Sequence, residues 1–282
     1  HTRFLPVSGL GDVYKRQMEE KPLGTGGPIK NAEKLIGRKD PFLVLNGDIL
    51  TDFDYSKIMK KHIEKGATAT IALYMVEDPS RYGIAELTEK NRVVRFVEKP
   101  AREKAPSNLA NAGIYALDPD IFDYIPSGRP VSIEREVFPK LVDEGKLYGY
   151  DLEGLWIDIG KPEDYLRANK LLLDTKIEKS QLGENVRMKS DVEIEAPTVV
   201  GDRVVIGEKS KVGPYVAIGE HTILGKEVRV ENSIIFARVI ISHFTSIKGA
   251  IIGEDVKIGR RVKIGDGCMI GDEAVIRDNV AL

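Results

Sequence analysis

The sequence predicts an α/β domain followed by a β-solenoid, and two observations point to this fold class. Up to about residue 176, short apolar runs alternate with stretches that carry helix start and stop signals. From Leu182 onward, apolar residues recur at every sixth position. A period of six fits no helix, and it is typical of a chain wound into coils of short strands.

Length and composition narrow the class of protein. The chain has 282 residues, of which 42% are apolar and 30% charged, as in ordinary globular proteins with one large or two modest domains. A net charge of −2 argues against a nucleic-acid surface. A single cysteine, Cys268, excludes an intrachain disulfide and suits a reducing, cytoplasmic setting. No apolar run is long enough to predict a membrane span.

Residues 1–17 differ in character from the rest of the chain. They begin without Met, show no secretory pattern and share no periodicity with the next segment, and DVYKRQ resembles a translated sequencing adapter. We therefore expect a non-native segment at 1–17. We also expect an α/β domain at 18–176 that lacks its N-terminal part, and a solenoid at 177–282.

The stretch from Phe42 to Asp48, FLVLNGD, is the centre of the predicted α/β domain. Four apolar residues lead into Asn46, Gly47 and Asp48, which indicates a buried strand that ends in a turn. Ligands of open α/β sheets bind at the carboxyl ends of strands, so Asp48 is a candidate ligand. Ordinary turn chemistry is the alternative.

Further strands and helices are expected along the domain, with polar residues at several strand ends. A Gly-rich loop at 23–27 precedes a helix that has Pro28 near its start and Gly37 as its stop. The other expected helices begin at Asp54, Ser132 and Pro162, and the other expected strands lie at 67–76, within DPSRYGIAEL, at 92–98, at 111–117 and on both sides of Glu153 and Gly154. A second acidic strand end therefore falls at Asp158.

The solenoid is predicted from eighteen hexapeptide units, about six coils of three strands each. The register slips by one residue twice. The repeating apolar positions are Leu182, Met188, Ile194, Val200, Ile206, Val212, Ile218, Leu224, Val230, Ile235, Ile241, Ile247, Ile252, Ile258, Ile264, Ile270, Ile276 and Leu282.

The order of motifs resembles the sugar-1-phosphate nucleotidylyltransferases. The motifs that carry the resemblance are LGTGGPIKNAE, FLVLNGD, EDPSRYGIAEL, VVRFVEKP, NAGIY, SIEREVFP, LWIDIGKPEDYL and the hexapeptide tail. The resemblance implies a Rossmann-like nucleotidyltransferase domain followed by a left-handed parallel β-helix. It also implies transfer of a nucleotidyl group from a nucleoside triphosphate to a sugar 1-phosphate, with pyrophosphate released. SIEREVFP and LWIDIGKPEDYL favour the branch that uses GTP and mannose 1-phosphate.

The same resemblance assigns roles to individual residues. Asp48 and Asp158 match the ligands of Mg²⁺, an ion that takes oxygen ligands and commonly one or two carboxylates. Lys99 matches the residue that binds the sugar phosphate, and Asp48, Lys99 and Asp158 together form the implied catalytic set. The implied substrate-binding residues are Glu98, Asn111, Glu134 and Gly83 at the sugar, and Glu19, Leu23, Gly24 and Thr25 at the nucleobase.

The sequence departs from the family pattern at one important place. The leading G-x-G-T-R-L loop and the catalytic Lys that follows it are absent, and residues 1–17 stand there instead. We therefore expect this chain by itself to be inactive or nearly so. We also expect a homo-oligomer, by analogy with other solenoids of this kind.

Three alternatives remain open from the sequence. UTP or dTTP with glucose 1-phosphate is the closest rival substrate pair. A hexapeptide solenoid can also transfer acyl groups with a histidine as general base, and the candidates here are His221 and His243. The third alternative is a non-catalytic regulatory subunit, against which the presence of Asp48, Lys99 and Asp158 argues.

Overall fold

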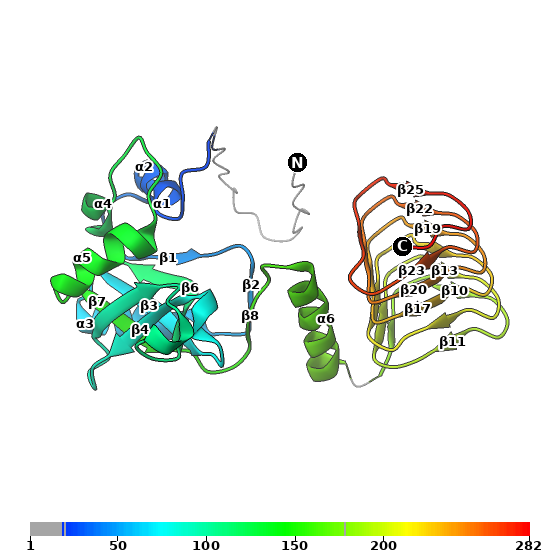
Figure 1. The fold of residues 1–282 in the computed structure, drawn as a ribbon, viewed down its shortest axis with the longest axis horizontal. Helices are drawn as coiled ribbons and strands as arrows, with labels where there is room; N and C mark the ends of the chain where they lie inside the picture. The colour runs from blue at the N-terminus through cyan, green and yellow to red at the C-terminus, as the bar shows by residue number, and fades with distance from the viewer. Residues whose placement is uncertain (1–18, 20, 178) are drawn as a thin grey trace. The chain divides into compact units, whose positions relative to one another are not determined.

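The computed structural model describes residues 19, 21–177 and 179–282, which form two compact units (Figure 1). Unit 1 contains residues 19, 21–47 and 52–156. Unit 2 contains residues 48–51, 157–177 and 179–282. The expected non-native segment at 1–17 lies outside the described residues. An α/β unit and a parallel β-solenoid are present, so the predicted fold class is confirmed.

Unit 1 is built on a six-stranded mixed sheet with the order β5-β4-β6-β3-β7, and β1 also pairs with β6. β6 is antiparallel to β1, β3 and β4, whereas β3 and β7 run parallel. The strands are β1 (Phe42–Leu45), β3 (Ala69–Met75), β4 (Gly83–Leu87), β5 (Val93–Glu98), β6 (Leu109–Leu117) and β7 (Leu147–Asp151). Each of these strands falls on an apolar run that the sequence marked.

The helices of unit 1 follow their local start and stop signals. α3 (Tyr55–Lys65) begins where the Asp54 carboxylate accepts the Ser56 N–H at 3.0 Å, and it ends at Gly66 with φ +57°. The single helix expected after the Gly-rich loop is instead split at Ala32. The remaining helices are α1 (Gly27–Asn31), α2 (Glu33–Ile36), α4 (Ile121–Tyr124) and α5 (Phe138–Asp143), with 3₁₀ turns at Pro79–Arg81 and Arg102–Lys104.

The bend expected at Pro139 is a change of helix type. A π-helical turn, Ile133–Val137, is capped by the Ser132 hydroxyl, which accepts the Arg135 N–H at 3.3 Å. α5 then begins at Phe138 with Pro139 in its first turn, where the missing proline N–H costs no intrahelical bond.

The core of unit 1 lies between the sheet and these helices. It consists of aliphatic and aromatic side chains, with Phe138 packed edge-on against both Tyr115 and Phe96. Its buried members are Ile29, Ala69, Ile71, Leu73, Ala85, Val93, Tyr115, Leu117, Ile121, Phe122, Ile125, Val131, Ile133, Val137, Phe138, Leu141 and Leu147.

Unit 2 begins with a two-stranded pairing of β2 (Ile49–Thr51) with β8 (Trp156–Asp158), of which Trp156 is still counted in unit 1. Helix α6 (Pro162–Lys176) follows, with Pro162 at its first position. None of the described helices is both long and apolar enough to span a bilayer.

The solenoid consists of seventeen short strands in three parallel sheets, stacked coil upon coil (Figure 1). The first sheet contains β9, β12, β15, β18, β21 and β24, the second β10, β13, β16, β19, β22 and β25, and the third β11, β14, β17, β20 and β23. The eighteenth expected unit is an isolated bridge between Lys263 and Ala281. The strands are Gln181–Leu182, Arg187–Met188, Glu193–Ile194, Thr198–Val200, Val205–Ile206, Lys211–Val212, Val216–Ile218, Ile223–Leu224, Arg229–Glu231, Ile234–Ile235, Ile240–Ile241, Ser246–Lys248, Ile251–Ile252, Lys257–Ile258, Lys263–Ile264, Met269–Ile270 and Val275–Ile276 (β9 to β25).

The hexapeptide pattern has a clear physical basis. The repeating apolar residue points into the solenoid and stacks on its equivalent one coil away, as Ile218 does on Val200 and Ile235. A corner follows, where a non-glycine residue such as His221 adopts φ +59°. The next valine or small residue points inward again, as Val204 does with no exposed surface. Each coil therefore buries side chains that it could not bury alone.

Candidate functional site

The Gly-rich loop of unit 1 is held against the segment before α5 by backbone hydrogen bonds. The Val131 N–H donates to the Leu23 carbonyl at 2.9 Å, and the Gly26 N–H donates to the Val131 carbonyl at 2.8 Å. Gly24 has φ +74°, and a Cβ there would lie 2.5 Å from the Val131 oxygen, so only glycine fits. The Glu19 carboxylate accepts the Leu23 N–H at 3.3 Å. The expected nucleobase residues are thus a preformed loop.

Thr25 links this loop to Glu134. Its hydroxyl donates to Glu134 Oε2 at 2.5 Å and accepts the Ile133 N–H at 3.0 Å. The Ser132 hydroxyl donates to the same Glu134 oxygen at 2.8 Å. An expected nucleobase contact and an expected sugar contact therefore share one hydrogen-bond network.

Tyr115 extends the network to Asn111. The Asn111 amide donates to the Tyr115 hydroxyl at 3.0 Å, and that hydroxyl donates to Glu134 Oε1 at 3.4 Å. Burial, reinforced by the Glu134 charge, raises the pKa of the Tyr115 phenol well above its usual range. Tyr115 therefore remains a neutral hydrogen-bond donor at any physiological pH.

Glu98, Lys99 and Gly83 form the next part of the site. Gly83 pairs with Glu98 across β4 and β5, and a Cβ at Gly83 would lie 2.6 Å from Glu98 Oε2. Burial raises the pKa of the Glu98 carboxyl, and the Glu134 carboxylate raises it further. The exposed Lys99 has φ +48°, a conformation that costs a non-glycine residue about 1–2 kcal/mol. Strain of this kind often accompanies function.

Asp48 and Asp158 are brought together in unit 2. Asp48 immediately precedes β2 and Asp158 ends β8, the two strands that pair, and the Ile159 N–H donates to the Asp48 carbonyl at 2.8 Å. Asp48 is exposed and Asp158 is partly buried. Two oxygen donors on neighbouring strand ends suit a divalent cation that takes its other ligands from phosphate and water. Among the described residues, no group of three or more His, Cys, Asp or Glu side chains could hold a metal ion by itself.

The expected residues therefore fall into two sets. Unit 1 gathers Glu19, Leu23, Gly24 and Thr25 with Glu134, Asn111, Glu98, Gly83 and Lys99, and unit 2 carries Asp48 and Asp158. Sequence reasoning missed Tyr115 and the hydroxyl role of Ser132. Tyr115 is 2% exposed within an apolar strand, so its sequence context indicates only a core residue. The sequence did point to Ser132, because a helix was expected to begin there.

The two histidines considered for acyl transfer have ordinary solenoid positions. His221 is an exposed corner residue whose N–H donates to the Asp202 carbonyl. His243 Nδ1 accepts the Lys226 N–H at 2.7 Å, which ties one coil to the next. In His243, only the other ring nitrogen, Nε2, would be left to act as a general base.

Comparison with known proteins places these motifs in a family. A model described as "Nucleotidyl transferase" matches residues 10–175, more than half of the chain. The chain belongs to the nucleotidyl transferase family. A second model, the "GMPPB C-terminal domain", matches residues 194–282 of this nucleotidyl transferase. The resemblance noted from the motifs is confirmed.

Curated relatives include proteins named mannose-1-phosphate guanyltransferase. The Candida albicans protein of that name is 43% identical over 159 residues, which cover 55% of this chain and 43% of the relative. The Candida glabrata mannose-1-phosphate guanyltransferase 2 is 41% identical over 176 residues, 60% of this chain and 48% of the relative. This nucleotidyl transferase thus spans a little under half the length of these relatives.

A solved structure also resembles the chain. It is a putative glucose-1-phosphate thymidylyltransferase from Bacillus anthracis in complex with a sucrose, with a TM-score of 0.51 and 27% identity. The match covers 58% of this chain and 66% of the other.

Proposed function

We propose that this nucleotidyl transferase joins GTP to mannose 1-phosphate, giving the nucleotide sugar and pyrophosphate. The observation that carries the proposal is the network through Thr25, Glu134, Tyr115 and Asn111, which connects the expected nucleobase loop to the expected sugar contacts. The names of the curated relatives support GTP and mannose.

The chemistry is an attack of the sugar phosphate oxygen on the α-phosphorus, with pyrophosphate leaving on the opposite side. Both reactants are anions that repel each other, so the protein must mainly orient them and offset charge. Lys99 supplies a compact positive charge for the sugar phosphate. Glu98, Asn111 and Glu134 offer acceptors and donors for sugar hydroxyls. The Leu23–Thr25 backbone presents peptide groups to the base.

The acidic pair of unit 2 completes the proposal. Asp48 and Asp158 would hold Mg²⁺, which when bound neutralises negative charge on the phosphates and orients them. Their oxygen chemistry and neighbouring strand ends fit this ion. We propose a cytoplasmic location as well, for which the one free cysteine, Cys268, is the support.

Binding to the chain as it stands provides the first test. Lys99→Gln removes a charge-assisted contact worth about 1.5–3 kcal/mol, so it should weaken mannose 1-phosphate binding roughly 10- to 100-fold in isothermal titration. Lys90→Gln, at another exposed lysine of unit 1, is the matched control and should bind as the wild type does. Equal affinity in all three proteins would contradict the role of Lys99.

Turnover would be measured in a chimera as well as in the chain itself. Residues 1–17 would be replaced by the N-terminal segment of the Candida albicans relative, and pyrophosphate release would be measured for four nucleotides crossed with mannose and glucose 1-phosphates. GTP with mannose 1-phosphate should be fastest in this chimera, whereas the unmodified chain should release little. A preference for UTP or dTTP with glucose 1-phosphate would contradict the proposed substrates and favour that rival pair. Binding of acetyl-CoA would favour the alternative of acyl transfer.

A further inference from the structure

Two corners of the solenoid carry a large aromatic ring at the residue with positive φ. These residues are Tyr215, with φ +58°, and Phe244, with φ +64°. Bulky side chains are uncommon in this conformation, which asparagine and aspartate adopt more easily. Backbone strain of this kind persists where the surrounding structure or a function compensates for it. We therefore asked what each ring contacts.

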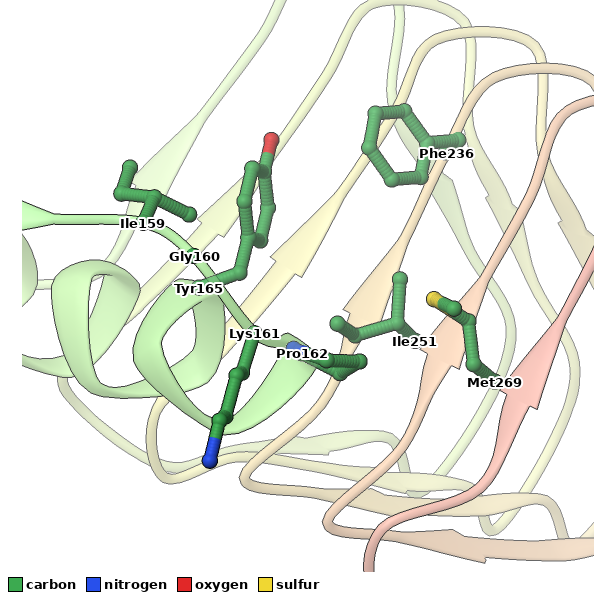
Figure 2. Close-up of a pocket in the computed structure, with 8 residues that line it drawn as sticks. All are labelled: Ile159, Gly160, Lys161, Pro162, Tyr165, Phe236, Ile251 and Met269. Carbon is green, nitrogen blue, oxygen red and sulfur yellow. The ribbon is translucent and has the colours of Figure 1, made fainter. Parts of the chain in front are cut away.

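Helix α6 accounts for Tyr215. The Lys170 ammonium of this helix lies 4.5 Å from the Tyr215 ring centre, close enough for a cation–π interaction. A second pair, Tyr165 of α6 and Phe236 of the solenoid, has ring centres 6.3 Å apart, and Figure 2 shows both rings. Outer aromatic rings on this solenoid thus have a role in binding another element.

Phe244 has a comparable cationic neighbour but remains 44% exposed. It lies at the corner between β19 and β20, with the His243 ring centre 6.2 Å from its own. The Arg261 guanidinium carbon lies 5.9 Å from the Phe244 ring centre. Arg261 belongs to the next coil, where its N–H donates to the His243 carbonyl at 3.1 Å. An exposed ring is therefore flanked by an imidazole and a guanidinium.

The polar groups around this ring are hydrogen-bond donors. His243 Nδ1 accepts the Lys226 N–H at 2.7 Å, so a neutral His243 carries its ring proton on Nε2, which donates. Arg260 and Arg261 are exposed and form no ion pair within the described part of the chain. A guanidinium has donors and no acceptor. Such a set of donors favours an anion.

The carboxylates nearest to this corner are already engaged. Asp278 Oδ1 accepts the Arg260 N–H at 2.7 Å. The Lys226 ammonium pairs with the Glu208 carboxylate and lies 3.9 Å from the Glu227 carboxylate. The side chains of Arg260 and Arg261 thus remain available for an anionic ligand.

We propose that this corner binds a nucleoside phosphate. The base stacks on Phe244, and the phosphate oxygens accept hydrogen bonds from Arg260, Arg261 and His243 Nε2. Stacking on an aromatic side chain accepts any base, because every base has a π-face. Arginine suits phosphate because its planar fork can bind two oxygens at once. None of these residues belongs to the proposed catalytic set, so the proposal does not depend on the proposed function.

Photolabelling with 8-azidoadenosine 5′-diphosphate tests the location. Trypsin cleaves after Arg238 and Lys248, so residues 239–248 form one peptide that contains His243 and Phe244. This peptide should be labelled saturably in the wild-type chain, and unlabelled ADP should prevent the labelling. The absence of saturable label on residues 239–248, or label on the Gly-rich loop at 23–27 alone, would overturn the proposal.

Three variants test the roles of the side chains through the half-saturating concentration of the label. Phe244→Asn removes the ring but suits a positive φ, so it should fold at least as stably and bind roughly 5- to 100-fold more weakly. Arg261→Gln should bind roughly 10- to 100-fold more weakly. His243→Asp can still accept the Lys226 N–H but repels phosphate, so it should also weaken binding.

Arg203→Gln is the matched control. Arg203 is an exposed arginine with φ +58° at a different corner of the solenoid, and this variant should be labelled as the wild type is. Equal half-saturating concentrations in the wild type, Phe244→Asn and Arg261→Gln would overturn the proposal, and thermal unfolding would verify that the variants fold.

Competition defines the class of ligand. Adenosine lacks the phosphates and inorganic phosphate lacks the base, so each should displace the label at least about 10-fold less effectively than ADP does. If inorganic phosphate competes as well as ADP, the corner is a simple anion site. If adenosine competes as well as ADP, the arginines have no role. Either result would overturn the assignment to a nucleoside phosphate.

Discussion

Under the proposed function, Thr25 would link the contacts to two neighbouring substrates. Its hydroxyl both donates to Glu134 and accepts from the Ile133 N–H, so the loop expected at the nucleobase and the residue expected at the sugar hold each other in place. If these residues bind the proposed substrates, such a network would fix both contacts before either substrate binds and so reduce the entropy lost on binding. Preorganisation of this kind is what a reaction between two mutually repelling anions requires.

His62 gives unit 1 a pH-dependent stability. It is 2% exposed in α3, with Nδ1 3.0 Å from the Thr70 hydroxyl, and burial lowers its pKa below the ordinary 6.5, an effect that Asp118 partly offsets. Below about pH 6.5 the unfolded chain takes up a proton that the folded chain resists. Stability should therefore fall with decreasing pH, by up to about 1.4 kcal/mol per pH unit, until the folded pKa is reached.

Urea unfolding between pH 7.5 and 5.5 would measure this effect. His62→Gln, which keeps a polar partner for Thr70 but does not titrate, should lose less stability over this range than the wild type. His221→Gln, at an exposed corner, should lose as much as the wild type. An identical pH dependence in wild type and His62→Gln would exclude His62 as the source.

Single residues were predictable where their role is local. The cap at Asp54 and the stop at Gly66 depend on short-range hydrogen bonding and backbone conformation, and both were predicted. Tyr115 was not predicted, because a tyrosine in an apolar strand gives no sign of which way its hydroxyl points. Its partners Asn111 and Glu134 lie on different elements, and only the fold brings them together.

Several corners of the solenoid combine a glycine with a hydrogen-bond acceptor one coil away. The Asp202, Asp272 and Asp278 carboxylates accept the N–H groups of Glu184, Glu254 and Arg260 at 2.7–2.8 Å. Each donor follows a glycine, and a Cβ on Gly183 would lie 2.5 Å from Asp202 Oδ1. His243 takes the place of the aspartate above Gly225, and its Nδ1 accepts the Lys226 N–H.

This equivalence leads to a prediction about His243. His243→Asp should keep the stability of the solenoid, because the carboxylate can accept the same N–H, whereas His243→Ala should lose about 1 kcal/mol. Chemical denaturation followed by far-ultraviolet circular dichroism would compare the two variants. Equal destabilisation by both would show that the imidazole contributes something other than an acceptor.

Elements formed by contiguous sequence were predicted better than pairings between distant strands. The hexapeptide period determines which residues face the solenoid core, and the expected positions from Val200 to Ile264 are buried. The pairing of β2 with β8 joins segments more than 100 residues apart, and the strand Ile49–Thr51 carries no turn or periodicity signal. The break between α1 and α2 at Ala32 was not predicted either. Alanine favours helix, so its own propensity gives no reason for a break at this position.

The described residues form two hydrophobic cores that have no residue in common. The sheet core draws on residues between Ile29 and Leu147, and the buried solenoid core draws on residues between Val200 and Ile264. Two separate cores predict two unfolding transitions, because neither core loses its own contacts when the other one opens. The single tryptophan, Trp156, is 8% exposed and belongs to unit 1, so its fluorescence should follow only one transition.

Matched core variants would assign the two transitions. Leu117→Ala and Ile241→Ala each truncate a side chain that is at most 1% exposed, and each should cost about 2–5 kcal/mol. Leu117→Ala should lower the transition seen by Trp156 fluorescence and leave the other in place. Ile241→Ala should do the reverse in scanning calorimetry, since the solenoid lacks tryptophan. One transition that both variants lower equally, with fluorescence and heat absorption coincident, would mean that the two cores unfold as a single cooperative body.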